Sequence, residues 1–497
     1  MPKKLPMFYS ALLLTGVNLL LRFVGTSFQV FLSSRIGAAG IGLLQLVLSV
    51  GSLAMIAGIG GIRTATMYLT AEELGKKRPG NVRWVLSGCF LYSISFSCTV
   101  SAILYIFAPQ IAQNWIGDDR TITALRLFAA FLPVSCLCSV MTGYFTAANR
   151  IGTLATVEVA EQALSMTITV AALTFWAGTD PVKATCSVVL GSNLGACLTL
   201  CCLIWLRLRE SSTPGNRIPV RSRLLQAALP LALADNLKSG INTLENLMVP
   251  KRLTLCNLVT NPLAAFGLVS GMVFPVIMFP AAIVFGLAEL LIPELARCVA
   301  AGSDSRIRYL VQKSLRVVLI YGLLFGGLVY LLAEDVCLRL YRNTDAFLWL
   351  RYYALLIPML YCDAITDAMV KGLGQQRICV RYNIITSVMD VIFLYFLLPP
   401  CGMTGYFISF LITHLINFIL SLRRLLKISI QHIPFYIPAL SFASAIFAAA
   451  SAATISSASM RCLCFCLIFG SLLFLFRVLT GSDILWVIGL VRKKSPS

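Results

Sequence analysis

Charge is scarce in this sequence, and negative charge is the scarcer sign. Of the 497 residues 12% are charged, whereas a soluble protein has about 25%, and 20 Asp and Glu stand against 40 Lys and Arg. Histidine occurs twice, as His414 and His432, and neither lies near other metal-ligand residues at ligand spacing. A P-loop, a GxSxG motif and an HExxH motif are all missing. We therefore expect no resident metal, no cofactor, no enzymatic site and no ATP-driven motor in this chain.

Paired CxxC motifs are also missing, although the chain has 17 cysteines. Most of them fall inside apolar stretches, and the run CLCFC at 462–466 steps by two residues, so its thiols do not share one face of a helix. A free cysteine in such a setting behaves as a small apolar side chain. We therefore expect packing roles for the cysteines.

Long apolar runs are abundant. The chain is 58% hydrophobic with a mean hydropathy of +0.86, and a bilayer core about 30 Å thick needs roughly 20 apolar residues per helix. The sequence predicts an all-α polytopic membrane protein, and its first apolar run is too long for a cleaved signal peptide. We expect about fourteen spans, near 8–33, 41–69, 84–108, 122–146, 153–178, 184–206, 225–249, 263–288, 315–334, 348–370, 383–398, 405–422, 434–453 and 461–479.

Basic residues are distributed unevenly between the loops on the two sides. If the N-terminus is cytoplasmic, the cytoplasmic loops hold most of the 40 Lys and Arg. This bias follows the positive-inside rule and predicts that both termini are cytoplasmic. It also explains the net charge of +20 without a nucleic-acid partner.

The order of the spans predicts the domain organisation. The stretch RLRESSTPGNRIPVRSR is the most polar segment, and it predicts a cytoplasmic linker at 207–224 that follows an N-terminal six-helix lobe at 1–206. A second six-helix lobe is expected at 225–430, and two extra helices with a basic tail at 431–497. Each block has basic loops after its second and fourth spans, which indicates parallel repeats. Two such lobes around a central cavity are typical of a transporter.

Arg22 lies near the middle of the first apolar run. A charge at the bilayer centre costs roughly 2.5–3.5 kcal/mol on insertion scales, so it faces protein or water. Asn18, Arg22 and Gln29 share one helical face, and this stripe is expected to line a water-filled cavity. The alternative is that Arg22 forms a structural ion pair with a buried carboxylate. Both interpretations hold if a substrate competes with that carboxylate for Arg22.

A second polar stripe occurs in the predicted seventh span. Its members fit one broad helical face, and they are Asp235, Lys238, Asn242, Glu245 and Asn246. A fully lipid-exposed helix could not hold them, so the stripe lines the cavity or packs between the lobes.

Carboxylates in the fifth span are candidates for ion coupling. Glu158 and Glu161 are three residues apart, so they share a face and can hold a proton or Na⁺. Alternatively, Glu158 is simply solvated near the cytoplasmic end. Arg63 follows several glycines in AGIGGIRTATMYL, and it is expected either to reach the cavity or to pair with Glu161.

Three acids occur in predicted spans ten and eleven. Asp363 and Asp367 are four residues apart, and the nearby Lys371 favours a helix-end ion pair. Asp390 is a lone acid whose partner the sequence does not identify.

Three stretches carry a family resemblance: LLLRFVGTSFQVFLSSRIGAAGIGLLQL, GYFTAANRIGTLATVEVAEQ and PLALADNLKSGINTLENLMVPKRL. The chain resembles the stage V sporulation protein B group, in the polysaccharide-exporter branch of the multidrug/oligosaccharidyl-lipid/polysaccharide flippase superfamily. The resemblance covers essentially the whole chain, including the 6 + 6 + 2 layout. It implies a V-shaped, two-lobed fold with alternating access in the bacterial cytoplasmic membrane.

The resemblance also implies a substrate class. Members of the group move undecaprenyl-pyrophosphate-linked sugars or peptidoglycan precursors across the membrane. In the superfamily's lipid II flippases, basic residues in spans one, two and eight serve the cavity. Arg22 and Arg63 fall in the corresponding first two spans, whereas Arg252 lies just before the eighth, so that position is not matched.

The leading hypothesis is therefore a monomeric secondary transporter of an anionic lipid-linked saccharide. Arg22, Arg63 and Lys238 would offset the pyrophosphate, and Na⁺ or H⁺ would couple at the buried acids. One alternative is a multidrug and toxin extrusion type antiporter, which exports organic cations and needs an acidic cavity. Another is a scaffold that recruits cell-wall enzymes without transport.

Overall fold

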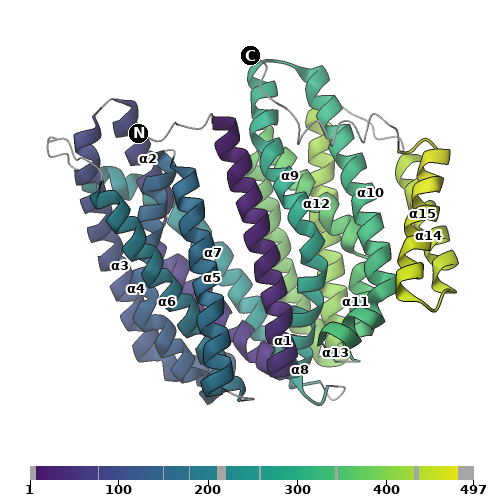
Figure 1. Ribbon diagram of the computed structural model, residues 1–497, viewed down its shortest axis with the longest axis horizontal. Helices are drawn as coiled ribbons and strands as arrows, with labels where there is room; N and C mark the ends of the chain where they lie inside the picture. Colours follow the sequence, from purple (N-terminus) through teal and green to yellow (C-terminus); the bar gives the residue numbers. More distant parts are fainter. Residues whose placement is uncertain are drawn as a thin grey trace. The chain divides into compact units, whose positions relative to one another are not determined.

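The computed structural model describes residues 7–76, 78–148, 150–177, 180–209, 220–256, 259–341, 345–429 and 436–479. Within these ranges the chain forms α-helices with short 3-10 and π-helical turns and no β-strand (Figure 1). The predicted all-α class is confirmed. Most of the predicted linker, at 210–219, and both chain termini, at 1–6 and 480–497, lie outside the described residues.

The helices follow the predicted spans closely. The first seven are α1 (Met7–Ile59), α2 (Ile62–Gly75), α3 (Val82–Gln110), α4 (Ile122–Ala147), α5 (Ile151–Ala172), α6 (Pro181–Leu208) and α7 (Val220–Leu253). They are followed by α8 (Pro262–Leu268), α9 (Phe274–Ala300), α10 (Asp304–Val336), α11 (Ala346–Ala354), α12 (Ile357–Gly372), α13 (Gln376–Ser429), α14 (Tyr436–Ala453) and α15 (Ala458–Leu475).

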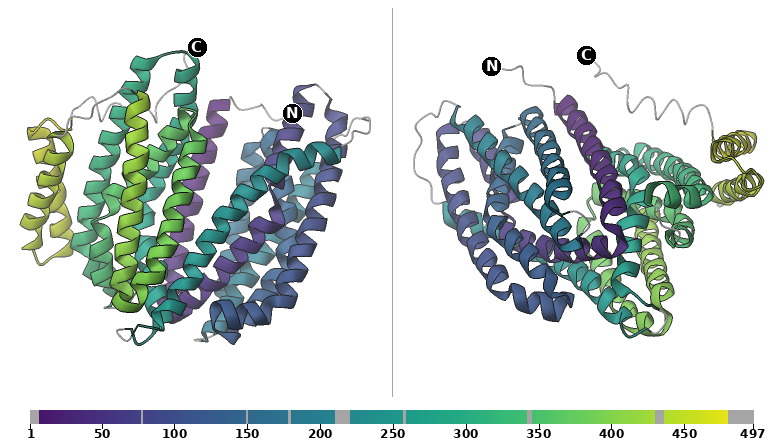
Figure 2. Two further views of the ribbon diagram at one scale, coloured as in Figure 1. Left: turned by 180° about the vertical axis from the view of Figure 1, so that it is seen from behind. Right: turned by 60° about the horizontal axis from the view of Figure 1, so that its bottom comes forward.

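Two of these helices each contain two spans. α1 has 53 residues and α13 has 54, and at 1.5 Å per residue each would measure about 80 Å, far more than a bilayer core of about 30 Å. Gly37 breaks α1 with φ 71° and Gly402 breaks α13 with φ 56°, a left-handed conformation that glycine adopts without a Cβ penalty. α1 bends sharply at this break (Figures 1 and 2). The breaks fall between the predicted spans 8–33 and 41–69, and between 383–398 and 405–422.

Ten helices among the described residues are long and apolar enough to cross a membrane, or up to eleven if α11 and α12, bent by 51°, form one span. This number is lower than fourteen for two reasons. The segments Leu20–Leu74 and Gln376–Ser429 each count once, although each holds two predicted spans. α7 does not qualify, because its polar stripe lowers its hydropathy. All 17 cysteines are free, and eight of them are buried whereas four are exposed, so the expected packing role fits only part of the set.

The chain divides into two compact units. Unit 1 comprises Met1–Gly271 with Leu394–Met403, and unit 2 comprises Met272–Phe393 with Thr404–Ser497. Unit 1 includes α7 and α8 because both pack on α1. The predicted lobe boundary at 207–224 concerns the sequence repeat and stays a prediction.

Small residues bring α1 and α8 together in unit 1. A Cβ at Gly267 would collide with the carbonyl oxygen of Ala38 and would lie 2.6 Å from the nitrogen of Gly42. A Cβ at Gly271 would collide with the side chain of Ile41. Glycines four residues apart allow helix backbones to approach closely in a membrane, so this contact depends on the sequence GLVSG at 267–271.

The C-terminal hairpin of α14 and α15 packs on α10 in unit 2. Leu323 and Leu331 of α10 share an apolar cluster with Ala448 of α14 and with Phe465 and Phe469 of α15. Arg461 adds a polar anchor, because its guanidinium donates to the carbonyl oxygen of Leu331 at 2.8 Å. The two extra helices are therefore a packed part of unit 2.

Candidate functional site

The three predicted cations lie on three different helices of unit 1, and their side chains are exposed. Arg22 is on the first half of α1, Arg63 is in the first turn of α2, and Lys238 is on α7. α7 packs on both α1 and α2. Asn242, one turn after Lys238, is also exposed, whereas the side chains of Asn18 and Asp235 lie outside the described residues.

We expect the face of unit 1 that carries these exposed cations to contact water, and we call it the wet face. Arg22 and Arg63 lie within the membrane-spanning segment Leu20–Leu74. A charge in hydrocarbon costs roughly 2.5–3.5 kcal/mol or more, so such a charge faces a water-filled space or protein. Exposed charges at this depth are therefore expected to meet water and a polar ligand.

Arg63 follows a break in its span. Gly60 and Gly61 both have positive φ, at 50° and 70°. Gly61 is the N-cap of α2, and no side chain caps this helix end. The first N–H groups of a helix have no partner within the helix and carry a partial positive charge, so the backbone adds to the positive potential at Arg63.

Glu158 and Glu161 lie on α5 beside these helices. Both are half-buried, and α5 passes α1 where a Cβ at Gly25 would lie 4.0 Å from Gln162 Nε2. Thr199 Oγ1 donates to Glu161 Oε2 at 2.7 Å. Arg63 interacts electrostatically with Glu158, but among the described residues no ion pair within 4.0 Å joins Arg63 to either carboxylate. Glu161, one of the partners predicted for Arg63, therefore accepts a hydrogen bond from the Thr199 hydroxyl instead.

The stripe on α7 divides between the wet face and the packed face. Lys238 and Asn242 are exposed, whereas Glu245 and Asn246 are half-buried. Asn246 Nδ2 donates to Ser49 Oγ at 2.9 Å, and Thr243 Oγ1 donates to the carbonyl oxygen of Ser49 at 3.1 Å.

Ser49, the partner of the stripe, lies in the predicted second span at 41–69. The sequence analysis overlooked Ser49 and Thr243 because isolated hydroxyl residues are common in apolar helices. The spacing of three residues between Thr243 and Asn246 places both side chains on one face of the helix, and this pattern could have predicted their shared contact.

Asp363 and Asp367 of α12 form the most completely bonded carboxylate pair described in unit 2. Asn417 Nδ2 donates to both oxygens of Asp363 at 3.1 Å. Asp367 accepts from Ser421 Oγ at 2.8 Å and from Asn383 Nδ2 at 3.0 Å. Among the described residues no ion pair within 4.0 Å joins either acid to Lys371, so the expected helix-end pair is wrong. Both carboxylates are instead bonded by side chains of α13.

Asp390 also has partners, which the sequence left unidentified. Its Oδ1 accepts from Ser409 Oγ at 2.5 Å and from Thr413 Oγ1 at 3.2 Å. His414, which follows Thr413, packs against Phe410 with ring centroids 4.2 Å apart and the rings tilted by 45°. The described residues contain no group of three or more His, Cys, Asp or Glu that could hold a metal ion.

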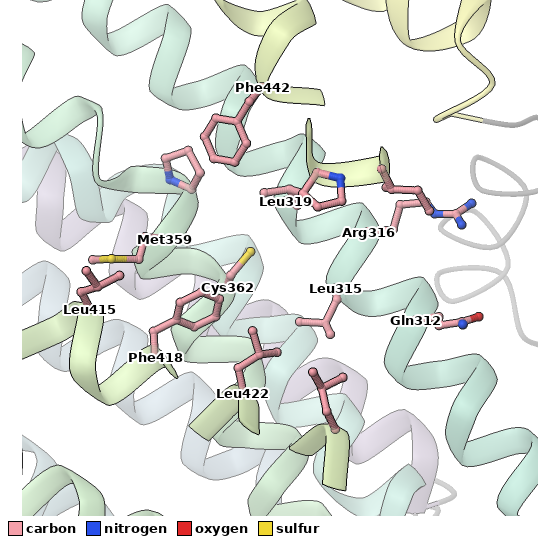
Figure 3. A pocket seen from close by; sticks show the side chains of 14 residues that line it. Gln312, Leu315, Arg316, Leu319, Met359, Cys362, Leu415, Phe418, Leu422 and Phe442 are labelled. Carbon is pink, nitrogen blue, oxygen red and sulfur yellow. The ribbon is translucent and has the colours of Figure 1, made fainter. Parts of the chain in front are cut away.

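Unit 2 also has an apolar pocket of about 590 Å³. Its walls come from α10, α12, the second half of α13, and α14. Figure 3 shows Leu415, Phe418 and Met359 at one side of the pocket and the polar residues Gln312 and Arg316 at the other. The pocket is apolar along most of its wall and cationic at one end. It therefore matches a membrane lipid, which has an apolar chain and a polar headgroup.

Apolar helices long enough to cross a membrane, with exposed cations in the segment Leu20–Leu74, are features of a multi-pass membrane protein. Residues 14–175 and 244–396 match the family model described as MatE, which is more than half of the chain. The chain belongs to the MatE family, within the multidrug/oligosaccharidyl-lipid/polysaccharide flippase superfamily, whose members are transporters rather than enzymes.

Similar proteins agree with this assignment. The chain is 20% identical to stage V sporulation protein B of Bacillus subtilis (strain 168) over 406 residues, which cover 79% of this chain and 78% of that protein. The fold is similar to the inward closed conformation of the lipid II flippase MurJ, with a TM-score of 0.70, 13% identity, and coverage of 94% and 98% of the two chains. An inward-facing multidrug resistance MATE family transporter matches with a TM-score of 0.67, 13% identity, and coverage of 84% and 100%.

Proposed function

We propose that the protein is an alternating-access flippase or exporter of an undecaprenyl-pyrophosphate-linked saccharide or peptidoglycan precursor. The observation that favours this substrate is the set of three exposed cations on unit 1, Arg22, Arg63 and Lys238, of which the two arginines lie within an apolar spanning segment. Guanidinium groups bind phosphate oxygens through a planar fork of donors. The uncapped start of α2 beside Arg63 adds backbone N–H groups of the kind that bind anions.

The names of two similar proteins support the same substrate class. One is a lipid II flippase, and another is a sporulation protein of a bacterium. A monomer in the cytoplasmic membrane with both termini cytoplasmic belongs to this proposal. With the inside negative, outward movement of two negative charges is favourable by roughly 4.6 kcal/mol per 100 mV, twice the single-charge value.

Reconstitution tests the substrate directly. Purified protein in proteoliposomes should move a lipid-linked pyrophosphoryl saccharide between leaflets, and depletion of the protein in cells should cause undecaprenyl-linked intermediates to accumulate, as measured by mass spectrometry. The rival function is export of organic cations by a multidrug and toxin extrusion type antiporter. The similarity of the fold to a multidrug resistance MATE family transporter supports this rival. Efflux of an organic cation from the same proteoliposomes, without saccharide movement, would establish the rival.

The apolar pocket of unit 2 supports a lipid-linked substrate, and it yields a prediction. Leu415→Trp should reduce movement of a long-chain polyprenyl substrate severalfold, because the indole fills space that a hydrocarbon chain would occupy. A short-chain analogue should be moved at the normal rate. Ile412→Trp is the matched control, because Ile412 is exposed on the same helix but is not part of the pocket wall. Equal rates for both lengths in Leu415→Trp would mean that the pocket does not hold the chain.

Coupling to Na⁺ or H⁺ is part of the proposal, and two carboxylate pairs offer a site for it. Among the described residues, Glu158 and Glu161 in unit 1 accept a single side-chain hydrogen bond between them, from the Thr199 hydroxyl. Asp363 and Asp367 in unit 2 accept from two amides and one hydroxyl. Asn417 is 4% exposed, and its Oδ1 has no hydrogen-bond partner, which leaves an acceptor for a cation beside Asp363.

The better-built pair is therefore expected to be the coupling site. Asp363→Asn should remove the dependence of transport on a Na⁺ or H⁺ gradient, whereas Glu161→Gln should keep it, because only the first change neutralises the carboxylate beside the open acceptor. The measurement is the initial transport rate with each gradient imposed and collapsed in turn. The reverse pattern would move coupling to Glu158 and Glu161.

A further inference from the structure

Four exposed cations gather where α13 begins and ends, and we call them the basic patch. They are Arg377, Arg381, Arg423 and Lys427. The first two lie in the first two turns of α13, and the other two lie in its last two turns. The two ends of this helix meet, because Arg424 Nη2 donates to Gln375 Oε1 at 2.7 Å. Side chains that are 49 residues apart in the sequence are therefore brought to one end of unit 2.

Neighbouring acids do not neutralise the basic patch. Among the described residues none of its four cations forms an ion pair within 4.0 Å, and the sequence has no Asp or Glu at 368–389 or 391–482. The end of α9 is different, because Glu294 there pairs with Arg297 at 3.3 Å and with Arg306 at 2.5 Å. The basic patch therefore presents its full positive charge to its surroundings.

The first half of α13 continues the basic patch as an exposed apolar stripe. Ile385, Val388 and Ile392 are 42%, 44% and 48% exposed. Their spacing of three and four residues places them on the same helical face as Arg377 and Arg381. This face is cationic for its first two turns and apolar for the turns that follow.

The second half of α13 repeats this arrangement in the opposite direction. Ile412 and Ile419 are 37% and 41% exposed, and they share a helical face with Arg423 and Lys427. The segment Gln376–Ser429 is long and apolar enough to cross a membrane. Both halves therefore carry exposed apolar side chains along the span and two cations at the same end.

We propose that the basic patch and the two apolar stripes bind an anionic phospholipid of the membrane. Its phosphate contacts the cations, and its acyl chains lie along the stripes. The planar fork of an arginine matches phosphate oxygens, and clusters of about four to eight Lys and Arg at the end of a spanning helix are typical of anionic lipid sites. A soluble anion would use the cations but not the stripes. Because the cations come from both ends of α13, the bound lipid holds these ends together.

Arg377→Gln combined with Arg381→Gln tests the site at the first end of α13. The side chains are exposed and have no ion pair, so the melting temperature in phosphatidylcholine alone should equal that of the wild type. Each cation near an anionic membrane surface accounts for about a fivefold change in binding, so this double variant should bind phosphatidylglycerol roughly 25-fold more weakly. Arg423→Gln combined with Lys427→Gln should show a similar loss, and it tests the site independently if the first variant fails to fold.

Arg297→Gln combined with Arg306→Gln is the matched control. It removes the same amount of charge from exposed side chains of unit 2. Glu294 already neutralises part of that charge, so the control should bind phosphatidylglycerol nearly as tightly as the wild type.

The measurements are native mass spectrometry of the purified full-length protein with added phosphatidylglycerol, and the melting temperature in nanodiscs of phosphatidylcholine with and without phosphatidylglycerol. The wild type should prefer phosphatidylglycerol and melt at a higher temperature in its presence, and both patch variants should lose the preference and the rise. Unchanged binding by both patch variants overturns the proposal. An equal loss in the control also overturns it, because net charge alone would then explain binding. Competition by soluble glycerol phosphate as strong as that by the lipid would make the patch a site for a free anion and overturn it as well.

Discussion

Arg22→Glu should abolish movement of the lipid-linked anion while the folded protein stays in the membrane. The side chain of Arg22 is exposed on α1 within an apolar span, so reversal of its charge makes the wet face repel a pyrophosphate. Arg22→Ala should be less severe, because it fails to attract the phosphate but does not repel it. Arg22→Lys should recover part of the activity, because the charge returns without the bidentate fork.

The measurements for this series are membrane abundance, melting temperature and the initial rate of saccharide-lipid movement. Arg126→Glu is a control, because Arg126 is an exposed cation of unit 1 near the start of α4, over the ring of Tyr105. If Arg22 serves a static ion pair, Arg22→Ala leaves a carboxylate unpaired at about 3–5 kcal/mol, and lost activity would follow lost protein. Normal transport by well-expressed Arg22→Glu would contradict the anionic substrate.

Gly267→Ala should prevent unit 1 from folding stably. The added Cβ collides with the backbone of α1 at Ala38 and Gly42, and backbone atoms cannot rotate away as a side chain can. Overpacking commonly costs about 1–3 kcal/mol and occasionally more, and a clash with backbone belongs at the upper end. We expect a large drop in membrane abundance and in melting temperature.

Gly240→Ala is the matched control for this prediction. Gly240 lies inside α7, and a Cβ there meets nothing within 4 Å, so alanine should stabilise the helix by roughly 0.5–1 kcal/mol. Well-folded Gly267→Ala protein with an unchanged melting temperature would show that α1 and α8 do not need their close approach.

The sequence by itself determined the class of the protein and the position of most of its helices. Scarce charge and continuous apolar runs of about 20 residues indicate a helical membrane protein, because a helix satisfies its backbone groups within its own segment, whereas the strands of a barrel are shorter and alternate in polarity. Arg22 and Arg63 were recognisable as functional candidates for the same reason, since a charge within an apolar run has a high cost. The order of the spans and the quoted stretches were enough to place the chain in its superfamily.

The tertiary structure decided which polar residues become partners. Asp363 and Asp367 bond to Asn417, Asn383 and Ser421 rather than to Lys371, and these partners are 16 to 54 residues away along the chain. Helical periodicity predicts contacts three or four residues apart but does not say which faces of distant helices meet. The bond between Arg424 and Gln375 and the close approach at Gly267 were hidden for the same reason: burial and steric fit depend on the packing of several helices, which local sequence pattern does not contain.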